Sequence, residues 1–261
     1  MKKIIYSACL IFFTLVAYAQ SEKIETERPG KTISPSTVQK NRIQVETGFS
    51  IQTEKVNYPR KDFYVQHPYL LTRYGLGKLI EIRLITELAT NKEINVNGTT
   101  IRTGLNNVQL GGKINLLKGK KLIPKVSLIA YYDFRRFHTM YKGRDTIDGA
   151  NFRLAFQHNF SENIFLAYNL GMEWKTFDTR HPNYVYTFSP RFLINERWFA
   201  FVEVFGSIWK DVSPENSIDF GLAYHIGNNF KIDASAGFGL NKKAPDNFYS
   251  VGASFRFKTA K

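Results

Sequence analysis

The chain has 261 residues, of which 43% are hydrophobic and 15% are aromatic, and its formal net charge is +14. So many aromatic side chains exclude collagen-like, coiled-coil and intrinsically disordered proteins. Beyond the first twenty residues there is no apolar run of the roughly eighteen residues that a membrane-spanning helix needs. The single cysteine, Cys9, excludes an internal disulfide. A basic, aromatic-rich chain without further cysteine would by itself suggest a nucleic-acid partner.

Residues 1–19 have the organisation of a secretory signal peptide. Lys2 and Lys3 precede an apolar run from Ile4 to Val16, and Ala17-Tyr18-Ala19 forms a small-x-small cleavage site. A short membrane anchor is the alternative, but this apolar run is too short to span a bilayer well. Cleavage would export the mature chain, so we predict no nucleic-acid partner.

Through most of the mature chain, apolar residues recur at every second position, which is the period of a β-strand with two unlike faces. Ile232 and Ala234, for example, alternate with Lys231 and Asp233. The pattern predicts twelve strands, at 43–55, 63–74, 79–90, 105–117, 122–134, 149–160, 164–176, 184–194, 198–209, 217–226, 230–240 and 248–257. Such strands are longer than the five or six residues usual in soluble sheets, and they match the roughly 9 to 11 residues that cross a bilayer at a tilt.

The connections between these strands alternate between long and short along the chain. Short ones, such as 161–163 and 227–229, carry tight-turn residues, whereas 91–104 and 135–148 are long. Bacterial outer-membrane barrels have an even number of strands, short periplasmic turns and longer extracellular loops. A soluble sandwich or a lipocalin-like barrel is the alternative, but it gives no reason for this sorting of loops.

We therefore predict an all-β fold, an antiparallel up-and-down transmembrane β-barrel of about 12 strands. The expected organisation is a cleaved signal peptide at 1–19, an irregular periplasmic or lumen segment at 20–42, the barrel at 43–257 and a tail at 258–261. The 20–42 segment could lie in the periplasm or fold into the lumen as a plug.

Two further features fit a membrane barrel. Trp174, Trp198 and Trp209 fall at strand ends, where an aromatic girdle would lie at the membrane interface. The last strand, Ser250 to Phe257, is similar to the terminal signal that the barrel-assembly machinery recognises in bacterial outer-membrane proteins. We therefore expect that machinery, outer-membrane lipid and lipopolysaccharide as partners.

Charged residues on the predicted strands should face the lumen, because a charge on the lipid face at mid-depth costs about 2 to 4 kcal/mol. Acidic and basic candidates are nearly balanced: Glu46, Arg73, Glu81, Arg83, Glu87, Lys113, Arg153, Glu173, Arg191, Glu203, Asp219, Asp233 and Arg256. They are either interstrand ion pairs that hold the barrel rigid or a charged constriction that selects solutes. Most of the surplus positive charge falls in the connections, where it would suit an anionic lipopolysaccharide or anionic solutes.

Sequence motifs for catalysis are missing from the chain. Some outer-membrane barrels are lipases that place a histidine and a serine two residues apart on one strand, and none of the five histidines has that spacing. There is also no Gly-x-Ser-x-Gly, Walker or His-Glu-x-x-His motif. We predict that the protein is not an enzyme and has no metal site and no cofactor.

Several segments resemble the outer-membrane family named for the meta pathway of phenol degradation. They include Thr26-Glu27-Arg28-Pro29-Gly30, Gln44-Val45-Glu46, Leu71-Thr72-Arg73-Tyr74-Gly75, Tyr168-Asn169-Leu170-Gly171 and Asp219-Phe220-Gly221. The resemblance runs from about Thr26 to Phe257. It implies an outer-membrane channel or transporter of unassigned solute, and it carries over no active-site residues.

The sequence thus predicts an outer-membrane channel or transporter that passes small solutes, hydrophobic or anionic, across the outer membrane of a Gram-negative bacterium. The style of the signal peptide suggests a Bacteroidetes source. The alternative is a non-conducting structural or adhesion barrel with a plugged lumen and loops that bind a partner. The particular solute does not follow from the sequence.

Overall fold

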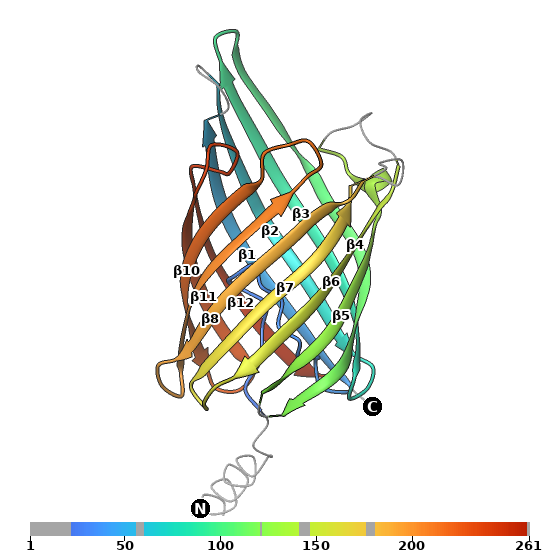
Figure 1. The fold of residues 1–261 in the computed structure, drawn as a ribbon. Helices are drawn as coiled ribbons and strands as arrows, with labels where there is room; N and C mark the ends of the chain where they lie inside the picture. The colour runs from blue at the N-terminus through green and yellow to red at the C-terminus, as the bar shows by residue number, and fades with distance from the viewer. Residues whose placement is uncertain (1–21, 56–59, 121, 141–146, 176–180, 260–261) are drawn as a thin grey trace, which may run out of the picture.

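A computed structural model describes residues 22–55, 60–120, 122–140, 147–175 and 181–259, and the predicted signal peptide lies outside these residues. Twelve antiparallel strands close into one barrel (Figure 1). Their bounds are β1 Arg42–Lys55, β2 Lys61–Gly75, β3 Ile80–Asn95, β4 Gly98–Lys120, β5 Ile123–Asp133, β6 Gly149–Asn159, β7 Ile164–Trp174, β8 Asn183–Leu193, β9 Trp198–Ile208, β10 Glu215–Ile226, β11 Phe230–Gly239 and β12 Asn247–Lys258. A short 3-10 helix, η1, spans Arg135–Phe137.

Each strand pairs with the next one along the chain, and β1 pairs with β12 to close the sheet. In that closing pair Gly48 lies opposite Gly252. Closure leaves no free sheet edge, so each strand has a partner on both sides. The predicted up-and-down barrel of twelve strands is confirmed.

The two faces of the sheet have opposite chemistry. On β10, Phe220 points outward with 54% of its surface exposed, whereas the adjacent Asp219 is 1% exposed inside. The other strands repeat this arrangement, with apolar side chains outside and mostly acidic, basic and amide side chains buried within, beside one apolar cluster that includes Leu71 and Ile129. An apolar exterior around a polar interior is stable when the exterior contacts lipid, which is what the alternating pattern predicts.

One predicted connection is wrong. Residues 91–104, expected to form a long loop, continue the β3–β4 hairpin to a turn at Val96 and Asn97. This hairpin rises beyond the rest of the barrel (Figure 1). There the two faces no longer differ in polarity, because exposed apolar residues such as Val96 and Ile101 stand among polar ones, and so the two-residue period disappears. Its β-branched threonines and isoleucines still favour strands, and Gly98 has a φ of +124°, which few other residues adopt.

The three tryptophans lie near the ends of the barrel wall. Trp174 ends β7 and Trp209 follows β9 at the end with the longer loops, while Trp198 begins β9 at the opposite end. Their role as an interface girdle stays a prediction. In the described part of the chain, no helix is long and apolar enough to cross a membrane.

Candidate functional site

The lumen contains a segment of the chain itself. We call residues 22–41 the plug, and Figure 1 shows this segment inside the barrel ahead of β1. The backbone N–H of Ile24 donates to the carbonyl of Asn228 (2.8 Å), in the short turn between β10 and β11. Lys40 forms an isolated bridge with Gly75, at the end of β2. Both of these contacts lie at the end of the barrel with the short turns. The plug therefore enters and leaves the lumen from the predicted periplasmic side.

Carboxylates of the barrel wall hold the plug by its backbone N–H groups. Glu46 accepts from Glu27 (2.8 Å) and Arg28 (3.1 Å), Glu203 from Lys31 (2.7 Å) and Thr32 (2.9 Å), and Glu81 from Val38 (2.6 Å). All three carboxylates are fully buried. Hydrogen bonds to a charged acceptor are stronger than neutral ones, so these three residues fix the plug along its length.

Cations of the wall hold the plug by its backbone carbonyl groups. Arg73 donates to Glu25 (3.2 Å) and Ser36 (2.9 Å), Lys113 to Ser34 (2.8 Å) and Ser36 (3.1 Å), Arg191 to Thr32 (2.7 Å), Lys231 to Arg28 (2.9 Å), and Arg256 to Glu22. The side-chain amide of Asn169 does both, accepting from the N–H of Ile33 (2.7 Å) and donating to its carbonyl (3.0 Å).

This arrangement accounts for the balance of charges in the lumen. A polypeptide main chain presents one donor and one acceptor per residue. A wall that carries acids and bases in similar numbers is complementary to it. The charged side chains of the wall therefore form a binding site for a main chain that is not part of the sheet. Neither interpretation from the sequence included this role.

The side chain of Glu27 joins the plug to two buried cations of the wall. Its Oε1 accepts from Lys113 Nζ (2.9 Å) and Arg83 Nη1 (2.6 Å), and its other oxygen also pairs with Arg83. Burial would raise the pKa of Glu27, but the charges of Arg83 and Lys113 outweigh it and hold the pKa well below its usual range. Glu27 therefore stays ionised in the docked plug, and this contribution to docking is lost only when the pH falls through that lowered pKa.

Arg28 occupies a space that two glycines leave open. A Cβ at Gly48 would lie 2.4 Å from the guanidinium carbon of Arg28, and a Cβ at Gly252 would lie 2.3 Å from its Nε. Through this space Arg28 reaches Asp233 (2.9 Å) and Ser250 (2.8 Å). The facing glycines of β1 and β12 thus make room for one side chain of the plug.

Other lumen residues lie away from the plug. Glu87 accepts hydrogen bonds from Gln66 (2.6 Å), Asn106 (3.0 Å) and Tyr64. Arg153 pairs with Glu173 (2.5 Å). A polar pocket of about 160 Å³ near the outer end is lined by Gln52, Glu54, Asp62, Tyr64 and Asn91.

The predicted lumen residues thus fall into two groups. Nine of them bind the plug or the ion-pair cluster around Glu27: Glu46, Arg73, Glu81, Arg83, Lys113, Arg191, Glu203, Asp233 and Arg256. Glu87, Arg153 and Glu173 bind other wall residues, and Asp219 lies opposite Glu203 in the β9–β10 register. Their part in solute passage stays a prediction.

Sequence reasoning missed several uncharged plug contacts. Gln44 donates to the Glu25 carbonyl (2.7 Å), Thr187 accepts from the Thr32 hydroxyl (2.7 Å), and Asn169 binds Ile33 on both sides. Gln44 and Asn169 belong to segments that carry the family resemblance. That position in the sequence was the available signal, because charge alone could not find them.

Replacing Glu27 with Gln should loosen the plug. The amide keeps the shape but removes one of the two carboxylates that Arg83 and Lys113 share, so that only Glu81 still pairs with them. A buried charge that loses a partner is costly. We expect the open probability in planar bilayers to rise by about tenfold or more, since about 1.4 kcal/mol of lost docking energy already gives a factor of ten. Glu25→Gln is the matched control, because the Glu25 carboxylate binds Ser34 within the plug (3.2 Å). Equal open probabilities for Glu27→Gln and the unmodified protein would contradict this role.

The described part of the chain has no candidate metal site. Among the described residues there is no group of three or more His, Cys, Asp or Glu that could hold a metal ion.

Comparison with known proteins gives a family match and several structures of similar fold. The sequence model of a family described as "Putative MetA-pathway of phenol degradation" matches residues 26–257. No curated protein matches the chain. Among solved structures, the COG4313 outer membrane channel from Pseudomonas putida F1 is similar with a TM-score of 0.64 and 9% identity, covering 90% of this chain and 100% of that one.

Two other solved barrels are more distant. The transport unit of the autotransporter AIDA-I from Escherichia coli has a TM-score of 0.51 and 11% identity, covering 91% of this chain and 93% of that one. A deltaS2 mutant of the TodX monoaromatic hydrocarbon channel has a TM-score of 0.50 and 9% identity, covering 87% and 93%. At such identities the similarity is one of fold.

Proposed function

We propose, since this chain belongs to the family described as "Putative MetA-pathway of phenol degradation", that it is a non-enzymatic outer-membrane channel for small solutes whose lumen the plug closes at rest. The twelve-stranded barrel with an apolar exterior supports a position in the outer membrane of a Gram-negative bacterium. The Bacteroidetes source stays a prediction.

One observation carries the proposal: the wall binds the plug through polar contacts to its main chain. The plug also makes an apolar contact, because Ile33 packs in a buried cluster with Leu71 and Ile129, and its release would expose this surface to water at a cost. If the plug leaves, water can take its place and hydrate the wall side chains that bound it. These side chains are charged or polar on each strand that contacts the plug. The lumen is therefore suited to alternate between a plugged and a hydrated state, as a gated channel requires.

The solute that we propose is small, and either hydrophobic or anionic. When the plug leaves, Arg83 and Lys113 lose the carboxylate of Glu27 and share only that of Glu81, so two cations face one anion and can attract an anionic solute. The TodX structure is named as a monoaromatic hydrocarbon channel, which makes small aromatic compounds a reasonable first series. An aromatic carboxylate such as benzoate combines both properties.

Swelling of liposomes that contain the purified protein tests the proposal. We expect benzoate to enter faster than benzylammonium of similar size, and larger sugars to be excluded. Equal rates would contradict the anion preference. If neither solute enters, even for a chain without its plug, the non-conducting structural or adhesion barrel replaces the channel as the better description.

We also propose contacts of the barrel with the membrane and with the assembly machinery, and the second contact involves β12. Ser250 to Phe257 lie in this strand, which closes the barrel against β1. We propose this segment as the one that the barrel-assembly machinery recognises, with outer-membrane lipid around the finished barrel. The apolar exterior supports the lipid contact.

A further inference from the structure

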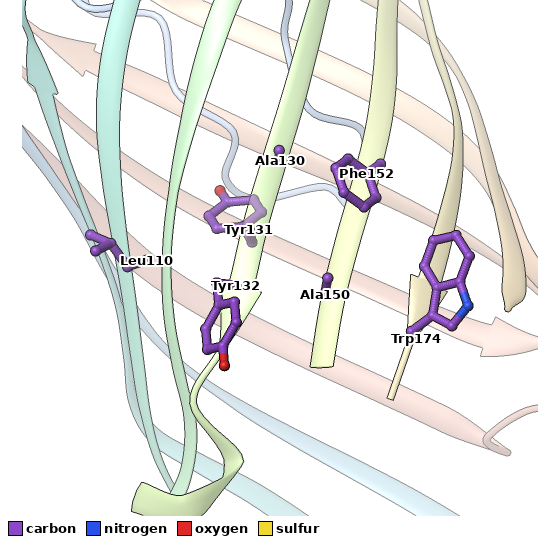
Figure 2. Close-up of a pocket in the computed structure, with 7 residues that line it drawn as sticks. All are labelled: Leu110, Ala130, Tyr131, Tyr132, Ala150, Phe152 and Trp174. Carbon is purple, nitrogen blue, oxygen red and sulfur yellow. The ribbon is translucent and has the colours of Figure 1, made fainter. Parts of the chain in front are cut away.

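The lipid-facing surface of β4 to β7 carries a groove unrelated to the lumen. It has a volume of about 610 Å³ and is lined by Leu110, Ala130, Tyr131, Tyr132, Ala150, Phe152 and Trp174 (Figure 2). The buried Tyr131 side chain contacts Arg83 within the lumen, and the other lining residues are outward positions of their strands. The groove is thus an apolar depression in the surface that meets the membrane.

The register of the strands explains the depression. Ala130 lies opposite Phe152, and Ala150 lies opposite both Tyr132 and Trp174. Two alanines on adjacent strands therefore form a low floor between large side chains. A shallow apolar channel of this kind accommodates a hydrocarbon chain that runs along the barrel wall.

The outer end of the groove is bordered by two arginines. On one side, the Tyr132 hydroxyl donates to Asp148 (2.7 Å), and Arg136 binds the same carboxylate. On the other side, Arg135 Nη1 donates to the carbonyl of Lys175 (2.8 Å), the residue that follows Trp174. Arg135 and Arg136 belong to η1, so this short helix lies at the mouth of the groove.

The charges at this mouth are mainly positive. Among the described residues that the hydrogen bonds place at this mouth, the cations Arg135, Arg136 and Lys175 accompany the carboxylate of Asp148, and the Arg136 side chain is 61% exposed. The Arg136 hydrogen bond lowers the pKa of Asp148, although burial opposes it, so this carboxylate stays ionised and keeps Arg136 in place. A cationic mouth above an apolar floor is complementary to an anionic amphiphile.

We propose that this groove binds lipopolysaccharide, with one acyl chain of its lipid A on Ala130 and Ala150 and a phosphate at Arg135 and Arg136. The groove opens to the outer leaflet, because its charged end lies at the end of the barrel with the longer loops. Binding here does not depend on the proposed channel function, since none of these outward side chains contacts the plug.

Native mass spectrometry of the detergent-solubilised protein with bis-phosphorylated lipid A tests the proposal. We expect one tightly retained lipid A. Ala130→Leu/Ala150→Leu fills the floor, and Arg135→Gln/Arg136→Gln removes the charges; each pair should weaken retention about tenfold, the factor that 1.4 kcal/mol corresponds to. The matched controls are Ala234→Leu/Ala236→Leu on the outward face of β11 and Lys242→Gln/Lys243→Gln in the β11–β12 loop, and they should bind as the unmodified protein does.

Three outcomes would overturn the proposal. In the first, the control pairs lose lipid A as strongly as the groove pairs do. In the second, phosphatidylglycerol or dephosphorylated lipid A is retained as well as the phosphorylated form, which would indicate nonselective lipid contact. In the third, the groove is the contact between two copies of the chain, so that filling it changes the oligomeric state and leaves lipid A retention unchanged. Heat-modifiable gel migration shows that each variant still forms the barrel.

Discussion

Removing residues 22–38 should turn the protein into a constantly conducting pore. This deletion leaves Gln39 to lead into β1 and takes away every plug group that the wall carboxylates and cations bind. A barrel of eight strands is filled by its own side chains, and sixteen strands leave an aqueous channel, so a twelve-stranded lumen without its plug should admit water and ions. We expect single-channel conductance to rise at least about tenfold in planar bilayers.

Two controls make this result interpretable. Heat-modifiable migration must show that the shortened chain still closes, since the wall charges have lost their partners. A second chain, in which 22–38 are replaced by a Gly/Ser segment of equal length, keeps a main chain but lacks Glu27 and Arg28; we expect intermediate conductance, because part of the binding is to backbone groups alone. If the shortened and the full chain conduct equally, the plug does not limit passage.

Locking the plug should abolish solute entry. The hydroxyls of Thr32 and Thr187 are 2.7 Å apart and both residues are buried, which suits a disulfide between cysteines at these positions. Apart from Cys9, in the predicted signal peptide, the chain has no other cysteine. Oxidised Thr32→Cys/Thr187→Cys should therefore lose benzoate entry to the background of empty liposomes, and a reducing agent should restore it.

The single variants Thr32→Cys and Thr187→Cys are the controls and should be insensitive to oxidation. Mass spectrometry confirms that the bond has formed. Unchanged entry through a chain with that bond in place would mean that solutes cross without release of the plug, and the gated lumen would have to be abandoned.

The barrel itself is largely predictable because its environment imposes one rule on every strand. Lipid outside and polar groups inside require alternation, and residues such as Phe220 and Asp219 report it directly. The rule fails where both faces become alike. That is why the sequence predicts a loop at residues 91–104, where the β3–β4 hairpin rises beyond the rest of the barrel.

The site was predictable only in part. Alternation places Glu46, Arg73 and Glu203 on the inner face, but it does not say what they meet there. Their partner is a segment without periodic pattern, and most of its ties to the wall use backbone groups that every sequence possesses. Only a few side chains of the plug, such as Glu27 and Arg28, make charged contacts that the sequence could indicate.

The path of the plug also constrains how the protein is assembled. Arg28 binds Asp233 and Ser250, and Glu22 binds Arg256, so residues that precede β1 contact the strands that are made last. The plug cannot acquire these contacts until β11 and β12 have been inserted and joined to β1. Complete docking of the plug is therefore coupled to closure of the barrel, and a chain whose last strands fail to insert cannot hold its plug in full.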